Sequence, residues 1–505
     1  MQLLRPLLLD TVPSIQQSAA LALGRLANYS EELAECVVSA EVLPQLIYSL
    51  SEQNRYYKKA AAFVLRSISK HSAELAQCVV DAGSLESLVE CLSEFEPSVK
   101  EGAAWTLAYI ARHNESLAQS VVDTSNAVQQ LILCLQEPEL SLKRISASAL
   151  SEMAKHNISL AQNIVDNGGI NYLVPLIQHP DNKLVRQVCS ALAQIAKHSV
   201  DLAEAVVEAE IFPKVLSLLK KDKDLIVKKN AATLIREVAK HTPELARLIV
   251  NCGGDSVIIE YITETQGNIR LPGIMALGYI AAFSDTLALA IIVHQGILPL
   301  KDSLINEQED YIRAASAWSL GQIGRHTPDH SKALAQADIL SKLIAVYQDG
   351  SSSQDLKNKS QRALKAVLCK CTHLVALQPL LINYPTDDLS CKILKYIVQQ
   401  FAKVLPNDSA NRKSFVQSGA LQKVQELNHL YKQSTDKMGK DPAAADQQQT
   451  DDDGGDEAGN ENVNYQDMLQ YIAAINACFP PELVQYYSPN YSQTLLNKLD
   501  DFNIE

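Results

Sequence analysis

The feature that most constrains the fold of this chain is a Leu-Ala pair that recurs at a nearly constant interval. The pair begins at Leu33, Leu75, Leu117, Leu160, Leu202, Leu245 and Leu287. These positions are 42, 42, 43, 42, 43 and 42 residues apart. A histidine or aromatic residue keeps the same interval, at Tyr29, His71, His113, His156, His198, His241, Phe283 and His326. This period predicts stacked helical repeats, because one unit cannot bury its apolar face alone.

The stretch at 99–122, VKEGAAWTLAYIARHNESLAQSVV, shows what one unit contains. Apolar or small residues recur every three or four positions up to Ala111 and predict one face of a helix. Arg112 and His113 would lie in its last turn, where positive charge suits the helix dipole. A polar residue that can cap a second helix follows the corner. These predicted N-caps are Ser72, Asn114, Ser199, Thr242 and Thr327.

Full units continue to about residue 345, and each reads as three helices. A short helix and a Gly- or Pro-marked corner precede a middle helix, a loop and a long Ala-rich third helix. Three helices per unit favour armadillo repeats over two-helix HEAT repeats, and AAWTLAYIA and SAWSLGQIG resemble the armadillo third helix. We therefore predict an all-α, right-handed superhelical armadillo-repeat solenoid of about eight repeats, with divergent closing helices and a C-terminal docking segment.

The predicted domains are 1–345, armadillo repeats with an incomplete first repeat, and 346–432, divergent closing repeats with helices at 357–381, 391–404 and 420–432. Residues 3–10 resemble the second helix of a unit, so we expect an uncovered apolar edge there. Residues 433–462 have the composition of a disordered acidic linker.

The last predicted domain, 463–505, is rich in aromatic residues and proline. Because such residues anchor interfaces, we predict a docking segment that latches onto a neighbouring copy or onto the end of its own solenoid. We expect its folding not to be needed for the repeat core. The candidate partner-binding residues of this segment are Phe479, Tyr486, Tyr487 and Tyr491.

The charge of the chain argues against some partners. The net charge is −13, and eight acidic residues and no basic ones lie between Asp441 and Glu461. The rest is mildly acidic, so we expect no nucleic-acid partner. No apolar run approaches the ~18 residues of a membrane helix, and the start lacks the pattern of a signal peptide. We expect no membrane partner and a cytosolic, cytoskeletal or nuclear protein.

We find no catalytic, cofactor or metal constellation in the sequence. The repeat histidines are too far apart to share a metal, since stacked helices lie roughly 8–10 Å from one another. We interpret them as residues that pack between repeats. Cys36 and Cys78 share one repeat position and Cys91 and Cys134 another, and we interpret these thiols as reduced, buried small hydrophobes.

A row of cations also follows the repeat. We define the basic row as Lys58, Lys100, Lys143, Arg186, Lys228, Arg270 and Arg313, which stand at the start of the third helices. Cations are unfavourable at this end of a helix. Two explanations remain open: the cations pair with acidic loop residues such as Asp181, Asp224 and Asp310, or they form a positive ridge for an acidic partner.

The third helices also bear on transport function. In importin-α-type armadillo proteins, the third-helix Trp is followed four residues later by an Asn that clamps an extended peptide. Here that clamp position reads Arg25, Ser67, Tyr109, Glu152, Gln194, Glu237, Tyr279 and Gln322. We therefore expect a basic nuclear-localisation peptide to bind no better than non-specifically.

Several stretches resemble one family over nearly the whole chain: LLRPLLLD, KHSAELAQCVVDAGSLESLV, KEGAAWTLAYIARHNESLAQSVVD and FPPELVQYYSPNYSQTLL. They are similar to the armadillo-repeat proteins of the axonemal central apparatus. The resemblance implies a non-enzymatic scaffold on central-pair microtubules, with tubulin and other axonemal proteins as partners, self-association, and a role in flagellar motility. It implies a place in the cytoplasm, cytoskeleton and ciliary or flagellar axoneme. The alternative is a soluble armadillo adaptor in transport or signalling.

Overall fold

The computed structural model describes residues 3–52, 54–220, 223–385, 392–438, 465–491 and 495–496. All regular secondary structure in these ranges is helical, as predicted. The chain consists of two compact units, Met1–Ile280 and Ala281–Glu505, and the division falls within α19 (Leu271–Phe283). The linker predicted at 433–462 lies largely outside the described residues.

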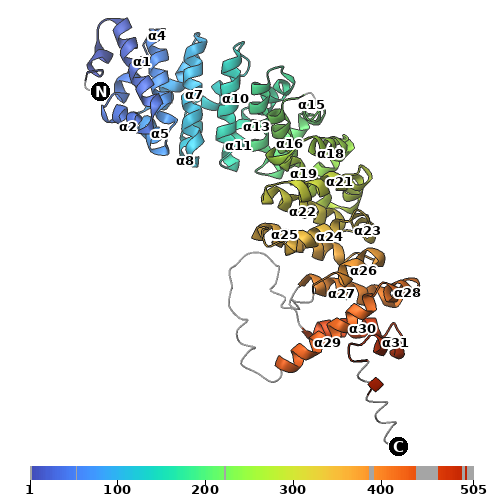
Figure 1. Ribbon diagram of the computed structural model, residues 1–505. Helices are drawn as coiled ribbons and strands as arrows, with labels where there is room; N and C mark the ends of the chain where they lie inside the picture. The colour runs from blue at the N-terminus through green and yellow to red at the C-terminus, as the bar shows by residue number, and fades with distance from the viewer. Residues whose placement is uncertain are drawn as a thin grey trace, which may run out of the picture. The chain divides into compact units, whose positions relative to one another are not determined.

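The N-terminal unit is built from units of three helices (Figure 1). The long third helices are α1 (Pro13–Tyr29), α4 (Arg55–Ser69), α7 (Pro97–His113), α10 (Leu140–Ala154), α13 (Asn182–Ala196) and α16 (Leu225–Ala239). The short first helices are α2 (Glu31–Ser39), α5 (Ala73–Asp81), α8 (Glu115–Asp123), α11 (Ile158–Asp166), α14 (Val200–Glu208) and α17 (Pro243–Asn251). The middle helices are α3 (Leu43–Ser49), α6 (Ser84–Cys91), α9 (Ala127–Leu133), α12 (Gly169–Leu173) with η2 (Val174–Gln178), α15 (Phe212–Leu218) and α18 (Gly254–Glu264).

Successive third helices pack side by side in chain order from α1 to α16 (Figure 1). Their alanines make this possible, because small side chains let neighbouring backbones approach. Ala61 and Ala104 are fully buried, as are the larger side chains of Leu107 and Leu150. This repeated contact makes one continuous core along the unit.

The corner that precedes each first helix is capped as predicted, with one exception. Side-chain oxygens of Ser72, Asn114, Ser199 and Thr242 accept a hydrogen bond from the backbone N–H three residues later. Thr327 occupies the same position, but its hydroxyl lies 2.6 Å from Nδ1 of His330 and makes no cap hydrogen bond. Thr327 is therefore the N-cap residue of α23, as predicted, but its hydroxyl contacts His330 instead of a backbone N–H.

Residues 3–10, which resemble the second helix of a unit, form only one short 3-10 helix, η1 (Pro6–Leu9), which begins at a proline. Leu8 is fully buried, and its carbonyl accepts a 3.0 Å hydrogen bond from the Tyr57 hydroxyl. Leu3 and Leu9, by contrast, are 86% and 66% exposed. The expectation of apolar surface at this edge is confirmed.

The C-terminal unit continues the same pattern and then departs from it. After α20 (Asp285–Val293) and α21 (Ile297–Asn306) come α22 (Asp310–Gly324), α23 (Pro328–Gln336), α24 (Ile339–Gln348) and α25 (Gln354–Leu368). The predicted boundary at 345 falls inside α24, and α25 packs on α22 as one third helix packs on another. Helix α25, which lies inside the range predicted for divergent closing repeats, therefore packs as a third helix does.

The closing helices are α26 (Leu374–Ile382), α27 (Lys392–Val404), η4 (Leu405–Asn407), α28 (Ser409–Gln417) and α29 (Ala420–Met438). The predicted helix at 357–381 is broken at Cys369–His373, where a short turn separates α25 from α26. Helix α28 was not predicted; its Asp408 N-cap accepts a hydrogen bond from the Asn411 N–H at 3.2 Å. Beyond the linker, α30 (Tyr465–Asn476) and α31 (Pro481–Tyr486) follow.

Candidate partner-binding surfaces

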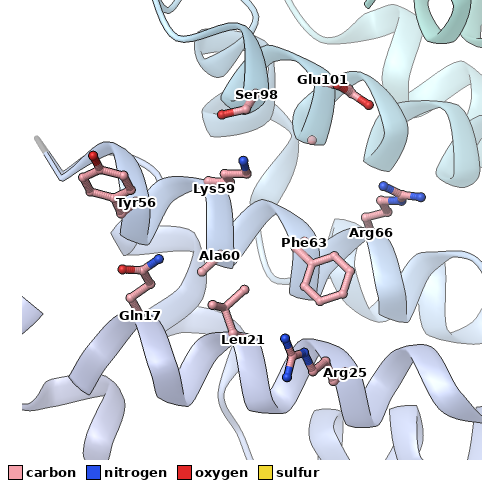
Figure 2. A pocket seen from close by; sticks show the side chains of 11 residues that line it. Gln17, Leu21, Arg25, Tyr56, Lys59, Ala60, Phe63, Arg66, Ser98 and Glu101 are labelled. Atoms are coloured by element: carbon pink, nitrogen blue, oxygen red, sulfur yellow. The ribbon is translucent and has the colours of Figure 1, made fainter. Parts of the chain in front are cut away.

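The face formed by the first three third helices carries a cavity of about 520 Å³. Figure 2 shows the side chains of α1, α4 and α7 that surround it, with the Phe63 ring between Arg25 and Arg66. Arg25 is the first of the eight clamp positions. This cluster could not be recognised from spacing, because its members come from three different repeats.

The repeat histidines lie between successive units, as predicted. Each Nε2 lies 2.6–2.7 Å from a backbone carbonyl at the end of the preceding third helix. The pairs are His71–Ala27, His113–Ser69, His156–Ala111, His198–Ala154, His241–Ala196 and His326–Ala281. The last carbonyls of a helix have no partner within it, so the histidine of the next repeat supplies one.

Burial favours the neutral form of four of these histidines. Burial lowers the pKa of His156, His198, His241 and His326, despite the hydrogen bond to the carbonyl. A neutral imidazole can donate from Nε2 to the carbonyl oxygen. The row is therefore a structural ladder that joins repeats. Among the described residues, no group of three or more His, Cys, Asp or Glu side chains could hold a metal ion.

The residue before the histidine adds a second set of bonds that the sequence analysis missed. Lys70 donates to the Asn28 carbonyl at 2.7 Å, Lys155 to the Arg112 carbonyl at 2.7 Å, and Lys197 to the Lys155 carbonyl at 2.6 Å. An ammonium group at a helix C-terminus also suits the dipole. The regular recurrence of a cation directly before the repeat histidine could have revealed this ladder.

Most of the basic row is paired within the stack. The Lys100 ammonium lies 2.5 Å from the Glu137 carboxylate, and Lys228 lies 3.4 Å from Glu264. Lys58 forms an ion pair with Glu94 in the same way. Each of these carboxylates belongs to the next repeat, 36 or 37 residues further along.

The rest of the row is more varied. Arg186 donates to Asp224 at 2.8 and 3.1 Å, Arg313 pairs with Asp310 at 2.9 Å, and Arg270 donates to a backbone carbonyl. Lys143 makes no ion pair among the described residues. Its neighbour Arg144 holds Asp181 instead, with donor distances of 2.5 and 2.8 Å.

These contacts determine which cations of the basic row remain available to an acidic partner. The predicted acidic partners Asp181, Asp224 and Asp310 all accept from an arginine, and the Arg144 guanidinium lowers the pKa of the Asp181 carboxyl. Arg144 and most members of the basic row therefore join repeats or bond within their own repeat. Binding of an acidic partner by this row stays a prediction.

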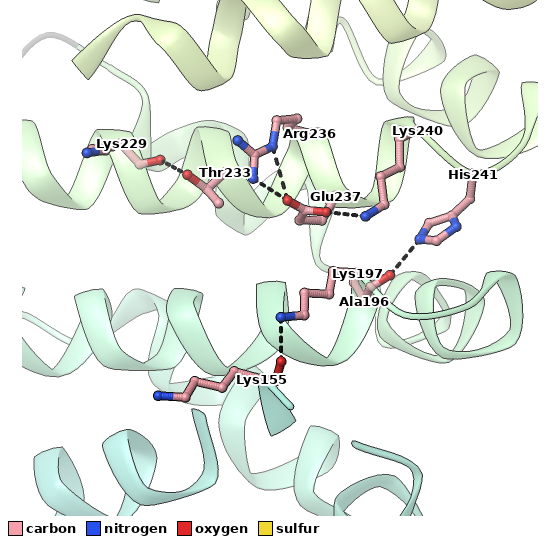
Figure 3. A network of polar contacts seen from close by, with 9 residues as sticks. All are labelled: Lys155, Ala196, Lys197, Lys229, Thr233, Arg236, Glu237, Lys240 and His241. Atoms are coloured by element: carbon pink, nitrogen blue, oxygen red, sulfur yellow. Dashed lines mark hydrogen bonds and ion pairs between the residues drawn. The ribbon is translucent and has the colours of Figure 1, made fainter. Parts of the chain in front are cut away.

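The acidic clamp positions are also engaged. Glu152 lies 2.6 Å from Lys155, and Glu237 accepts from Lys240 at 2.5 Å and from Arg236, as Figure 3 shows. Burial raises the pKa of the Glu237 carboxyl, but these donors outweigh it and the pKa is lowered. A basic peptide would have to displace lysines and arginines that are already in place.

The C-terminal segment docks on its own closing helices, one of the two alternatives that we predicted. α30 packs against α27 and α29, and its Met468, Ile472 and Ile475 are buried. Phe479 stacks on Phe415 with ring centroids 5.9 Å apart and planes inclined by 17°. The segment therefore supplies part of the core around the closing helices, and its independence from the folding of the repeats stays a prediction.

Three polar contacts fix the position of α30. Lys395 pairs with Asp467 at 3.2 Å, and the Gln399 amide donates to the Tyr471 hydroxyl at 3.1 Å. At the other end of the helix, the Gln425 amide donates to Asn476 at 2.6 Å. These contacts join residues that are 51 to 72 positions apart in the sequence.

The candidate aromatic residues of this segment therefore divide into two groups. Phe479 is only 9% exposed and contacts the closing helices. Tyr486, which is 58% exposed, lies in a cluster with Tyr487 and Tyr491, at centroid distances of 5.1 and 5.4 Å. This tyrosine cluster is thus partly exposed, and its binding to a partner stays a prediction.

The cysteines follow the predicted pattern in part. Cys91 and Cys134 are buried, and burial raises the pKa of their thiols to about 12 and about 11. Cys78 is half-buried, whereas Cys36 is exposed, so the interpretation of Cys36 as a buried hydrophobe was wrong. Cys36 belongs to α2, in the first complete set of helices, and its neighbour Val37 takes the buried position instead.

Membrane crossing was tested on the described residues. No single helix among them is long and apolar enough to cross a membrane. The pair α20 and α21, bent by 80° at their junction, meets the length and composition requirement only when taken together.

Comparison with known proteins agrees with this architecture. The Armadillo/beta-catenin-like repeat family matches residues 72–112 and 159–197. The crystal structure of an engineered protein from the Northeast Structural Genomics Consortium aligns with a TM-score of 0.70 and 26% identity. That alignment covers 79% of this chain and 97% of the engineered protein.

Two relatives show higher sequence identity over a shorter part of the chain. Sperm-associated antigen 6 from Homo sapiens is 54% identical over 199 residues, and that from Mus musculus is 55% identical over 199 residues. The match covers 39% of this chain and spans about a third, 32%, of the length of each relative. The chain is thus an all-α armadillo-repeat solenoid that is similar to sperm-associated antigen 6.

Proposed function

We propose that this chain is a non-catalytic scaffold of the ciliary or flagellar axoneme. In this proposal it belongs to the central apparatus, binds central-pair microtubules and neighbouring proteins, and supports motility. The observation that carries the proposal is the 54% identity to human sperm-associated antigen 6 over 199 residues. The armadillo fold adds support, because a stack of repeats presents an extended surface to protein partners.

The tyrosine cluster of Tyr486, Tyr487 and Tyr491 is the contact that we assign to a neighbouring axonemal protein or to a second copy of the chain. Tyrosine is enriched in interfaces because its ring supplies contact area and its hydroxyl a hydrogen bond. The cluster rests on α31 and the residues after it, which α30 and Phe479 hold in place on the closing helices.

The experiment is to image the full chain, fluorescently tagged, in a ciliated cell. We expect a signal along the axoneme that coincides with the central pair. The double variant Tyr486→Ala with Tyr487→Ala should lower this signal. Tyr48→Ala is the matched control, because Tyr48 is similarly exposed, at 66%, but lies in α3.

A diffuse cytosolic or nuclear signal from the unaltered chain would contradict the axonemal proposal and favour a soluble adaptor. If the tyrosine variant gives the same axonemal signal as the unaltered chain, the proposed location remains supported. That result would show that the contact lies in the repeats rather than in the tyrosine cluster.

A further inference from the structure

Three places in the sequence match the minimal target of a proline-directed protein kinase, which is a serine or threonine directly followed by proline. They are Thr242-Pro243, Thr327-Pro328 and Ser488-Pro489. Such a kinase transfers the γ-phosphoryl group of ATP to the side-chain hydroxyl. The three pairs look alike in the sequence, but the structure gives their hydroxyl groups different surroundings.

The two threonines lie at corners between packed helices. Thr242 is the N-cap of α17, and its hydroxyl oxygen accepts a 3.2 Å hydrogen bond from the backbone N–H three residues later. Thr327 is the N-cap of α23, and its hydroxyl lies 2.6 Å from Nδ1 of His330. A kinase binds its substrate as an extended segment, so it would have to unwind these helices and expose the fully buried Ala246 or Leu334. The fold therefore protects both threonines.

Ser488 is held less firmly. It follows α31, a helix of six residues, none of which is buried. A helix this short is not stable by itself. Ser488 is half-buried and Pro489 is exposed, and the Ser488 hydroxyl makes no hydrogen bond with any residue that the structure describes. Unwinding α31 would expose no buried side chain of that helix, so Ser488 is the accessible member of the three.

The backbone of Ser488 also shapes the tyrosine cluster. Its N–H donates to the Gln485 carbonyl, and its carbonyl accepts from the Tyr491 N–H, both at 3.0 Å. Across this turn the rings of Tyr486 and Tyr491 meet at a centroid distance of 5.4 Å, with planes inclined by 62°. The arrangement of the rings therefore depends on the turn at Ser488.

A phosphate on Ser488 would oppose this arrangement. It carries a charge of about −1.5 to −2 at pH 7 and requires hydration or a cationic partner. Residues 481–491 include no lysine or arginine, and their one charged side chain is the carboxylate of Glu482. The face of an aromatic ring is also negative. The phosphorylated side chain should therefore turn into water and pull the turn open.

We propose that Ser488 is a phosphorylation site for a proline-directed serine kinase and that its phosphorylation opens the tyrosine cluster. In the reaction, Oγ of Ser488 bonds to the γ-phosphorus of ATP, the bond to the β,γ-bridging oxygen breaks, and ADP leaves. The hydroxyl proton passes to the catalytic aspartate of the kinase. This site goes beyond the proposed function, because neither the phosphate nor the opening depends on which partner the cluster contacts.

The test uses the purified full chain, ATP with Mg²⁺ and a purified kinase of the mitogen-activated class, and mass spectrometry locates the phosphate. We expect phosphate on Ser488 and less than about a tenth as much on Thr242 or Thr327, because their helices open rarely. Short synthetic peptides that carry each pair lack the fold, and we expect all three peptides to be phosphorylated.

Two variants check the assignment. Ser488→Ala removes only a hydroxyl and should abolish the incorporation of phosphate. The matched control is Thr327→Ala, which removes the hydroxyl of another pair and should leave the incorporation unchanged. Circular dichroism checks that both variants keep their helix content.

Hydrogen exchange measures the opening of the cluster. Phosphorylation should speed exchange at 481–491 on the order of tenfold, while exchange in α27 and α29 stays unchanged. The Ser488→Ala chain, treated with the same kinase and ATP, should exchange as the untreated chain does.

Three outcomes would overturn the inference. They are the absence of phosphate on Ser488 in the folded chain, equal phosphorylation of Thr242 or Thr327, and unchanged exchange at 481–491 after Ser488 is phosphorylated. Because these measurements are made on the purified chain, their failure leaves the imaging test of the proposed function unaffected.

Discussion

The docking of the C-terminal segment leads to a prediction about the stability of the C-terminal unit. The perturbation is Ile472→Ala, in the middle of α30. Ile472 is 1% exposed, and its neighbours on the same helix face, Met468 and Ile475, are fully buried. The matched control is Gln470→Ala. Gln470 is exposed on the same helix, and the intrinsic helix propensity of glutamine is similar to that of isoleucine.

The magnitude follows from the burial. Truncating a fully buried isoleucine to alanine costs about 2–5 kcal/mol, which combines lost burial with the cavity left behind. A substitution at an exposed position usually lies within about 0.5 kcal/mol. The polar contacts of Asp467 and Asn476 at the two ends of α30 should hold the helix in place, so the cavity should not close fully.

The assay is urea denaturation, combined with hydrogen exchange of α27 and α29 followed by mass spectrometry. We expect Ile472→Ala to lower the stability of these closing helices while exchange in the N-terminal unit stays unchanged. Ending the chain at Asn462 should have a larger effect in the same region. If Ile472→Ala and Gln470→Ala behave alike, α30 is not docked as the structure shows, and the segment is independent of the repeats after all.

Three further predictions concern the stack. Leu107→Ala, at a fully buried position in α7, should cost about 2–5 kcal/mol in urea denaturation, and a cost below about 1 kcal/mol would contradict the packing. Lys228→Ala should cost about 1.5–3 kcal/mol, because it removes a charge-assisted contact to Glu264 from a lysine side chain that is only 2% exposed. Lys143→Ala, at the same repeat position but without an ion pair in the described part of the chain, should cost less than about 1 kcal/mol, and equal losses would refute the pairing argument. Burial lowers the pKa of four repeat histidines, so at acidic pH the folded chain binds fewer protons than the unfolded chain. The contribution of these histidines to the free energy of unfolding should be complete above pH ~6.5 and should fall as the pH drops through their folded pKa. We therefore expect a lower urea midpoint at pH 5 than at pH 7.5.

Periodicity made the repeats predictable. The 42- or 43-residue spacing, the Gly and Pro corners and the caps at Ser72 and Asn114 act locally, so they can be read without knowing which helices meet. The repeat histidines were also predictable as residues between repeats. Their acceptors were not, because the Ala111 carbonyl lies 45 residues before His156 and belongs to another helix.

The candidate sites were predictable only in part, for the same reason. Spacing identified the basic row but could not show that Lys100 meets Glu137 while Lys143 makes no ion pair with any described residue. Arg25 and Lys59, two exposed cations that line the cavity on α1, α4 and α7, carried no periodic charge signal, because the same positions in the next unit are Ser67 and Glu101. They line one cavity only because three helices from successive repeats bring them together.

The sequence by itself determined the all-α class, the repeat length and the corners of each unit, because helix formation and capping depend on residues a few positions apart. The tertiary structure decided which charges are neutralised, since ion pairs such as Arg144 with Asp181 form between repeats. It also decided that the C-terminal segment folds back onto α27 and α29. Aromatic composition predicts that such a segment will dock, but the surface it buries depends on complementary packing between residues more than fifty positions apart.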